Sequence, residues 1–251
     1  MRVDVITPSV DRPDALARAI TSVASQTHED WRVWVVDDGD GRAAALANAW
    51  PDARVAGVMN DGSGQVDARM TGMRAGTGGV IMLLDDDDVL IDPEHLTRVV
   101  HVLQAGEALC HRPGWMVFEQ DGREVRREAF DPPTTSESLR RDNTVLTCGL
   151  AWRRETTDRL GPLDRSLGGY YDWDWILRVL DAGVPLRKVG GLGVGYTIHE
   201  HNASAKRDAA RTAMFEAFKA KHGLEIIQKD HLTVHQEGTE EGPSEGPQEA
   251  S

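Results

Sequence analysis

Four consecutive aspartates, Asp85 to Asp88, come directly after a short apolar run, Val80 to Leu84. Because adjacent carboxylates repel one another, a fold that keeps four together needs a compensating cation, and a divalent metal ion is the simplest one. Carboxylate oxygens are hard ligands that favour Mg²⁺ or Mn²⁺, and Mg²⁺ is often held by one or two carboxylates together with substrate phosphates. The pattern therefore indicates a metal site, with a solvated acidic turn or a helix cap as the alternative.

The backbone path through the four aspartates decides how many of them reach one ion. If the path stays extended, side chains on one face are ~6.6 Å apart, so Asp85 and Asp87 point one way and Asp86 and Asp88 point the other. At most one or two of the four carboxylates are then expected to contact the same ion.

A further acid, Asp172, begins the strongest helical pattern of the second half, Asp172 to Ala182. It shares one helical stripe with apolar residues, namely Trp175, Ile176, Val179 and Leu180. An acid on such a face stands out, although the helix dipole also favours an acid in the first turn. Asp174 lies on another face, four residues before Arg178, and is expected to form a surface ion pair.

A histidine, His199, comes directly after an expected strand, Val194 to Ile198. Both a metal ligand and a hydrogen-bonded structural residue fit that position. Aromatic residues of the second half leave a similar choice, because they could stack on a ligand or fill the core. These residues are Trp115, Trp152, Tyr170 and Tyr171.

The elements that must position these residues alternate between strands and helices in the first half. Strands are expected at Arg2 to Thr7, Trp31 to Val36, Arg54 to Val58 and in the run before the aspartates, and helices are expected at Pro13 to Val23, Arg42 to Trp50 and after Ser63. Such alternation predicts a parallel, doubly wound sheet, which binds ligands at the carboxyl ends of its strands. Three of these strands end in polar residues, which are Ser9 with Asp11, Asp37 with Asp38, and the four aspartates.

The second half is less regular. It is expected to contain helices at Glu94 to Gln104 and Ser204 to His222, paired strands at Trp115 to Glu119 and Glu124 to Ala129, and single strands at Thr144 to Trp152 and Leu186 to Val189. Beyond about Lys229 the chain is rich in Glu, Gly, Pro, Ser and Gln, and we expect it to be disordered.

Composition limits the classes of function. The 251 residues carry a formal charge of −13, and removing the five glutamates of the last sixteen residues still leaves −8. An acidic body argues against binding to nucleic acid. No apolar run approaches the ~20 residues that span a bilayer, and the first residues lack a hydrophobic signal region. Two cysteines are too few for a disulfide framework or a zinc site, so a cytoplasmic protein without an integral membrane segment is expected, with peripheral attachment to the inner membrane face left open.

Six motifs, in this order, resemble those of family 2 glycosyltransferases with the GT-A fold. They are VITPSVDRPDALARAITSVASQT, VWVVDDGD, ARMTGMRAG, VIMLLDDDDVLIDPEHL, GPLD with YYDWDWILRVLDAG, and HEHNAS, and together they span roughly residues 2 to 205. The resemblance implies an α/β fold with a Rossmann-like, doubly wound mixed sheet flanked by helices. Residues 1–228 would form one domain, with a nucleotide-sugar-binding half over about 1–92 and a smaller acceptor half with the C-terminal helix over 93–228. An acidic tail at 229–251 would follow.

The same resemblance assigns roles to individual residues. It places the nucleotide sugar against Pro8, Ser9, Val10, Asp11, Arg12, Asp37, Asp38, Arg69, Asp85 and Asp86. It makes the tetra-aspartate the D-x-D motif, with Mn²⁺ or Mg²⁺ on Asp87, Asp88 and His199; Asp87 is the first choice, and Asp88 replaces it if the register differs by one. Asp172 corresponds to the general base.

The implied reaction moves a sugar from a nucleotide-diphosphate sugar, with a UDP-sugar as the first candidate, to a hydroxyl of a saccharide or other acceptor, with inversion. Two other interpretations remain. A nucleotidyltransferase acting on a sugar phosphate would use a similar sheet, but it normally has a Gly- and Lys/Arg-rich loop after its first strand, where this chain offers only Arg12. A non-catalytic nucleotide-sugar-binding protein of the same fold would be expected to lose the base or the metal ligands.

Overall fold

The computed structural model describes residues 1–199, 202 and 208–240. Its main sheet has seven strands in the order β10-β6-β9-β4-β1-β2-β3. Their bounds are β1 Val3–Ser9, β2 Trp31–Asp37, β3 Val55–Met59, β4 Val80–Leu83, β6 Leu109–His111, β9 Ala151–Arg153 and β10 Leu186–Lys188. All neighbours are parallel except β9, which runs antiparallel to both β4 and β6. The predicted doubly wound mixed sheet is therefore confirmed.

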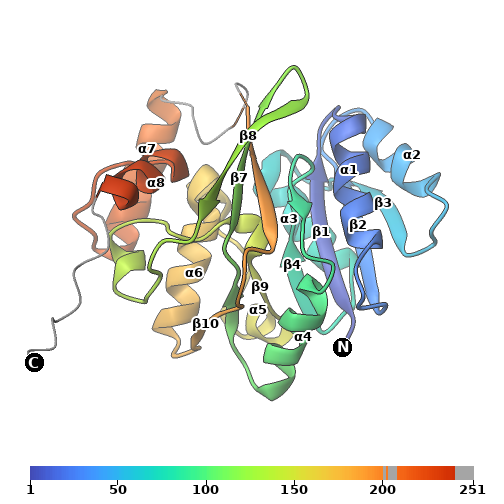
Figure 1. Cartoon of the computed structure of the whole chain (residues 1–251). Coiled ribbons are helices and arrows are strands. Elements are labelled where there is room, and N and C mark those ends of the chain that lie inside the picture. Colours follow the sequence, from blue (N-terminus) through green and yellow to red (C-terminus); the bar gives the residue numbers. More distant parts are fainter. Residues whose placement is uncertain (200–201, 203–207, 241–251) are drawn as a thin grey trace, which may run out of the picture.

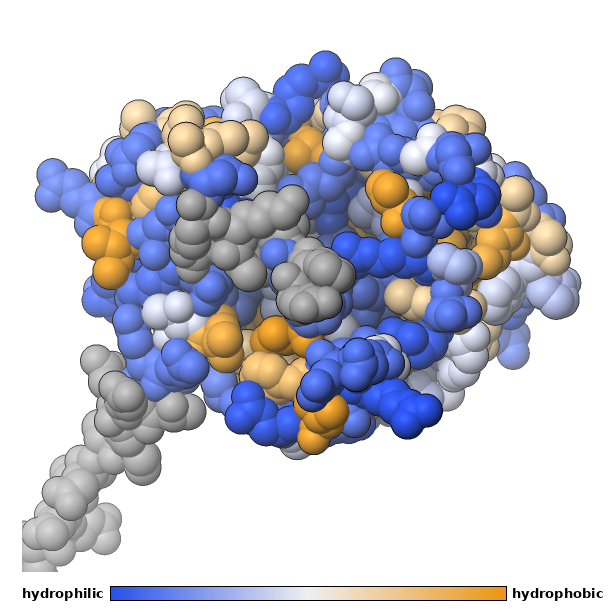
Figure 2. All heavy atoms as spheres, turned by 90° about the horizontal axis from the view of Figure 1, so that it is seen from above, coloured by the Kyte–Doolittle hydropathy of each residue, from blue (hydrophilic) through white to orange (hydrophobic). Residues whose placement is uncertain are grey.

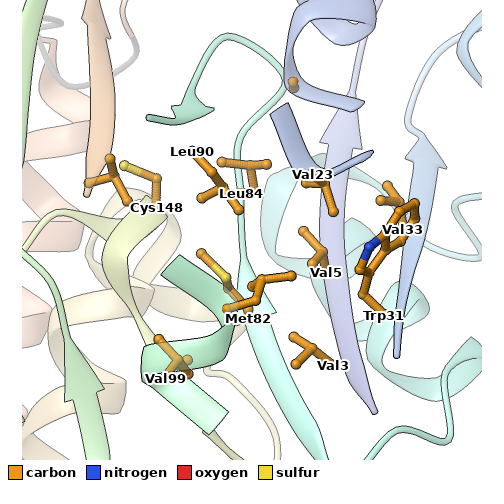
Figure 3. Close-up of a cluster of buried hydrophobic side chains, with 14 of the residues drawn as sticks. Val3, Val5, Val23, Trp31, Val33, Met82, Leu84, Leu90, Val99 and Cys148 are labelled. Atoms are coloured by element: carbon orange, nitrogen blue, oxygen red, sulfur yellow. The ribbon is translucent and has the colours of Figure 1, made fainter. Parts of the chain in front are cut away.

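Helices cover both faces of this sheet because its central strands are apolar on both sides (Figure 1). In β4, Val80 and Met82 face a core formed with α1 (Pro13–Ala24), α2 (Arg42–Asn48) and α4 (His95–Ala105). Figure 3 shows this cluster, with Met82 between Val99 and Val5. Ile81 and Leu83 face the second core, which contains α3 (Gly64–Ala75), α6 (Tyr171–Asp181) and α7 (Ala209–His222).

A smaller, four-stranded sheet follows the order β5-β11-β7-β8. It consists of β5 Val89–Leu90, β7 Gly114–Gln120, β8 Arg123–Phe130 and β11 Val194–Ile198. The predicted hairpin of β7 and β8 is confirmed, with its turn at Asp121 and Gly122. Because β5 starts directly after the four aspartates and pairs with β11, this sheet holds His199, at the end of β11, close to the acids.

Several expected elements of the second half differ in the structure. The strand predicted over 144–152 is wrong for most of its length, because only Ala151–Arg153 form a strand (β9) and a 3₁₀ turn spans Thr147–Gly149. A close backbone contact explains the turn, since a Cβ on Gly149 would lie 2.3 Å from the carbonyl oxygen of Arg112. The remaining short elements are α5 Arg154–Leu160 and 3₁₀ turns at Ser138–Arg140 and Arg165–Tyr170. The predicted start of the last helix at Ser204 lies outside the described residues.

The disordered tail is a wrong prediction for its first part, because His231–Glu240 form a helix, α8. Asp230 caps this helix, with its Oδ1 accepting the backbone N–H of Thr233 at 2.8 Å. Val234 is buried against the first core. The segment is rich in glutamate, but it also contains a capping residue, Asp230, and a buried apolar residue, Val234, and these two stabilise a short helix against the first core. Residues 241–251 lie outside the described part of the chain.

Candidate active site

A cavity of about 260 Å³ lies at the carboxyl ends of β1 and β4, where the doubly wound sheet predicts a ligand site. Hydrophilic residues surround a hollow on the face of the molecule seen in Figure 2. The structure brings ten of the fourteen predicted site residues to the cavity wall, namely Pro8, Ser9, Val10, Arg12, Asp38, Arg69, Asp85, Asp86, Asp87 and Asp172. Their roles remain predictions.

Four predicted residues lie outside the cavity wall. Asp11 is exposed and forms an ion pair with Arg42 at 2.8 Å. Asp37 is buried and accepts the backbone N–H groups of Gly39 and Ala44, so it stabilises the loop between β2 and α2. Asp88 and His199 are not among the residues that line the cavity. They belong to the same cluster as Asp87, because His199 Nε2 lies 3.0 Å from Asp87 Oδ2.

The tetra-aspartate forms a turn, so the condition of an extended path is not met. The backbone N–H of Asp88 donates to the carbonyl of Asp85 at 3.1 Å. This turn gathers Asp85, Asp87 and Asp88, each with an oxygen within 4.8 Å of the others, so three carboxylates face one point instead of the expected one or two. Asp86 alone turns away, and its Oδ2 accepts the hydroxyl of Ser9 at 2.7 Å.

Burial and mutual repulsion give the four aspartates different proton affinities. Burial raises the pKa of Asp85, and burial together with Asp87 and Asp85 raises that of Asp88 well above the ordinary value. Burial also raises the pKa of Asp86 to about 6. Burial acts in the same direction on Asp87, but the hydrogen bond with His199 and the charge of Arg12 outweigh it, so the pKa of Asp87 is lowered. Of the four aspartates, Asp87 is therefore the one that is most readily ionised.

Two arginines supply fixed positive charge beside the acids. Arg12 contacts both Asp86 and Asp87. Arg69 is 1% exposed, pairs with Asp85, and lies over the ring of Tyr171 at 4.6 Å. Both guanidinium groups are in place to bind an anionic ligand that reaches the acids.

The carboxylate cluster fits a divalent cation. Its ligand atoms are hard oxygens, which suit Mg²⁺ or Mn²⁺. Asp88 is 1% exposed, its Oδ1 accepts the backbone N–H of Thr197, and no N–H or hydroxyl of the described residues reaches its Oδ2. A buried carboxylate oxygen without a hydrogen-bond donor is costly, and a cation beside it would offset that cost.

Asp172 lines the same cavity and lies in the first turn of α6. Its Oδ2 accepts the hydroxyl of Thr147 at 2.8 Å and the amide of Asn143 at 3.3 Å. Its Oδ1 makes no hydrogen bond to the described residues. Asp172 is an acid of the first helical turn, as the helix-dipole interpretation expects, and it also has hydrogen-bond partners outside α6. Both donors therefore hold the same oxygen, Oδ2, of a side chain that lines the cavity.

Asp174, predicted as half of a surface ion pair, is instead fully buried. Its partners are Arg178 at 2.9 Å, Lys221 at 2.7 Å and His222 at 2.8 Å. The prediction was wrong about its burial because the i,i+4 spacing identified Arg178 but not α7, which covers this side of α6.

Several residues of the cavity wall were not expected from the sequence. They are Gln65, Asp142, Asn143, Thr147, Gly169, Trp173, Tyr196, Asn202, Arg211, Lys229, Asp230, His231 and Val234. Of the four aromatic residues considered for stacking, Tyr170 and Tyr171 line the cavity, whereas Trp152 is in the core and Trp115 is not part of the wall. The C-terminal segment thus contributes one side of the cavity.

Comparisons with known proteins agree with this geometry. The family "Glycosyl transferase family 2" matches residues 4–160. The glycosyltransferase alr2836 of Nostoc sp. is 30% identical over 251 residues, covering 91% of this chain and 74% of its own, and YwdF of Bacillus subtilis is 26% identical, covering 89% and 85%. The structure of S. aureus TarS residues 1–349 with UDP-GlcNAc superposes with a TM-score of 0.67 at 15% identity, covering 88% of this chain and 66% of TarS.

A second TarS structure gives a TM-score of 0.61 at 17% identity, covering 78% of this chain and 60% of TarS. Likeness at this identity shows the fold, which is the GT-A type. The family match covers more than half of the chain and includes the tetra-aspartate and the first strand of the cavity wall. The chain belongs to glycosyl transferase family 2 and is a glycosyltransferase.

Proposed function

We propose that this enzyme transfers a sugar, with inversion, from a nucleotide-diphosphate sugar to an acceptor hydroxyl, with Asp172 as general base and with metal assistance. The observation that carries the proposal is the position of Asp172, which shares one cavity with the carboxylate cluster. A donor bound at the cluster and an acceptor bound near Asp172 would meet between them. One in-line displacement at the anomeric carbon then inverts its configuration.

Each group of site residues would have a separate role in this reaction. Asp172 Oδ1 would accept the proton of the attacking hydroxyl, while Thr147 and Asn143 hold Oδ2. Arg69 and Arg12 would face the donor diphosphate. Asp87, Asp88 and His199, with Asp85 beside them, would hold Mn²⁺ or Mg²⁺. Such an ion, when bound, neutralises charge that develops on the leaving nucleoside diphosphate.

A UDP-sugar is the first donor to test. TarS, which shares the fold, was crystallised with UDP-GlcNAc and with UDP. In this chain Pro8, Val10 and Asp38 line the part of the cavity next to β1 and β2, where the nucleoside is expected. We assign residues 1–92 to the donor half and 93–228 to the acceptor half, and α8 now extends the acceptor half. A saccharide or another hydroxyl compound is the proposed acceptor, and a cytoplasmic location remains a prediction.

The two other interpretations account for less. A nucleotidyltransferase has no use for a base such as Asp172, and the family match argues against it. A non-catalytic binding protein would not need Asp172 to be oriented by two donors with one oxygen free.

Calorimetry tests the donor site first. UDP, GDP, TDP and CDP are each titrated into the protein with Mn²⁺ and with EDTA, using wild type and Asp87→Ala. We expect one nucleotide to bind only with metal, and the variant to lose this binding. The sugars linked to that nucleotide are then tested for release of the nucleoside diphosphate, by wild type and Asp172→Asn. Turnover that survives both EDTA and Asp172→Asn would refute the proposed mechanism, and the absence of any nucleotide binding would favour the non-catalytic protein.

A further inference from the structure

The loop of residues 143–147 donates hydrogen bonds to Asp172, and the same loop contacts the C-terminal helix α8. Asn143 and Thr147, at the two ends of the loop, both donate to Asp172 Oδ2. Between them, Val145 is 1% exposed, and its backbone N–H donates to Asn143 Oδ1 at 3.2 Å. The carbonyl of Val145 lies 3.0 Å from Nε2 of His231, the first residue of α8. A continuous chain of contacts therefore links α8 to the proposed base.

We propose that His231 is a positioning residue for glycosyl transfer, which clamps the 143–147 loop through the Val145 carbonyl and thereby orients Asp172. The inference rests on the proposed function, since it gives Asp172 the role of base. It assigns a task to a segment that the composition of the chain had suggested was disordered.

The surroundings of His231 suit a fixed clamp. A carbonyl oxygen can only accept a hydrogen bond, so Nε2 must carry the proton. Burial lowers the pKa of His231, which favours the neutral ring. Phe130 and Tyr196 contact the ring edge to face, with centroids 5.6 and 5.4 Å away. These side chains from β8 and β11 thus fix the orientation of the His231 ring, with Nε2 next to the Val145 carbonyl.

The clamp also explains why the loop is not a strand. The Val145 carbonyl, which could pair with a neighbouring strand, bonds to a side chain of α8 instead. A shift of this carbonyl would move both donors to Asp172, because Asn143 and Thr147 are each two residues away. Misplacement of a catalytic group by about 1 Å can reduce turnover about 100-fold. We therefore expect the loss of this single hydrogen bond to affect turnover more than donor binding.

The test compares four full-length variants with wild type. His231→Phe keeps an aromatic ring against Phe130 and Tyr196 but removes the N–H. His231→Gln restores an N–H at a similar distance from the backbone, whereas His231→Asn carries an amide that is too short to reach. His235→Phe is the matched control, because His235 lies on the same helix and near Phe130 but pairs with Glu128, away from Asp172.

The assay measures hydrolysis of the UDP-sugar that wild type turns over, with Mn²⁺, because water replaces the unidentified acceptor. Calorimetry with UDP and Mn²⁺ gives the fraction of competent protein. We expect His231→Phe and His231→Asn to lower kcat about tenfold or more, with the KM of the donor and the UDP affinity within about twofold of wild type. His231→Gln should recover most of kcat, and His235→Phe should match wild type. A purely structural role would instead lower the competent fraction and leave kcat per competent site unchanged.

The possible failures are distinct. Equal kcat in wild type and a UDP-binding His231→Phe variant would overturn the role of His231 and leave the proposed function intact. If His231→Phe does not fold, equal rates of the Asn and Gln variants would overturn it. Absence of nucleotide binding and donor turnover in wild type would overturn the proposed function itself, and the role of His231 with it.

Discussion

Replacement of Asp174 by Asn should destabilise the protein strongly while leaving the nucleotide site intact. Asp174 is fully buried, yet it is not a cavity residue. Its carboxylate neutralises a cluster of Arg178, Lys221 and His222, which joins α6 to α7. An amide of the same size keeps the packing but removes the negative charge, so the variant measures the charge alone.

The structure sets the size of the effect. Removing one partner of a buried ion pair costs about 3–5 kcal/mol. Two of the three partners keep other acceptors, because Lys221 also contacts Asp164 at 2.7 Å and Arg178 also donates to the carbonyls of Leu160 and Pro162. The lower end of the range, about 3 kcal/mol, is therefore expected. For a chain of this size it corresponds to a fall in Tm of about 6–12 °C.

Thermal and urea unfolding at pH 7 provide the measurement, with Asp181→Asn as control. Asp181 lies on the same helix and pairs with Arg140, but both side chains are about half exposed, so that variant should change stability by less than about 1 kcal/mol. Equal Tm values for the two variants would refute the reasoning.

Burial acts to raise the pKa of Asp174, but its hydrogen-bonded and charged partners outweigh burial and lower it. Its contribution is therefore complete above the ordinary value of 3.8 and is lost as the pH falls through the lower folded-state value, so the difference from wild type should shrink there.

Three further changes test other parts of the structure. Thr147→Val removes a 2.8 Å hydrogen bond to Asp172 and should lower donor turnover about tenfold or more, with UDP affinity unchanged in calorimetry. His95 is fully buried, and burial lowers its pKa to about 3 from an ordinary 6.5. Wild type should therefore lose about 1.4 kcal/mol of stability per pH unit below 6.5 through this residue, and urea unfolding of His95→Leu should show a shallower pH dependence. Gly57→Ala would place a Cβ 2.2 Å from a backbone oxygen of α2 and should cost about 1–3 kcal/mol, whereas Gly190→Ala meets open space and should be neutral in the same unfolding assay.

The sequence was sufficient to predict the first half of the fold. Its strands and helices there are governed by local patterns, such as the apolar run before Asp85 and the proline at position 13 in the first turn of α1. The convergence of strand ends on one crevice follows from parallel pairing alone, and eight of the ten predicted residues in the cavity wall lie at or just after a strand end, whereas Arg69 and Asp172 lie on helices. The sequence left the path through the tetra-aspartate open, because the pairing of β5 with β11 is a long-range contact that redirects the chain after Asp88.

The acceptor side was harder to predict because its residues are brought together by contacts between distant segments. Thr147 and Asn143 carry no motif, and their importance follows only from their distances to Asp172. For α8, a local signal was present, since Asp230 stands three residues before the Thr233 N–H that it caps. The abundance of Glu and Gly in the same segment outweighed it, and composition cannot show that Val234 meets an apolar surface.

In the proposed mechanism Asp87 and Asp172 have different tasks, and their hydrogen-bond partners differ accordingly. Asp87 contacts two potential cations, Arg12 and His199, and these lower its pKa against the effect of burial, so it remains an anion suited to binding a metal. The two donors to Asp172 are a neutral hydroxyl and a neutral amide, and both engage the same oxygen. Asp172 therefore has no permanent counter-charge among its hydrogen-bond partners and keeps one oxygen free for a proton. In the proposed reaction Asp87 therefore keeps its charge beside the metal ion, and Asp172 receives the proton of the acceptor hydroxyl.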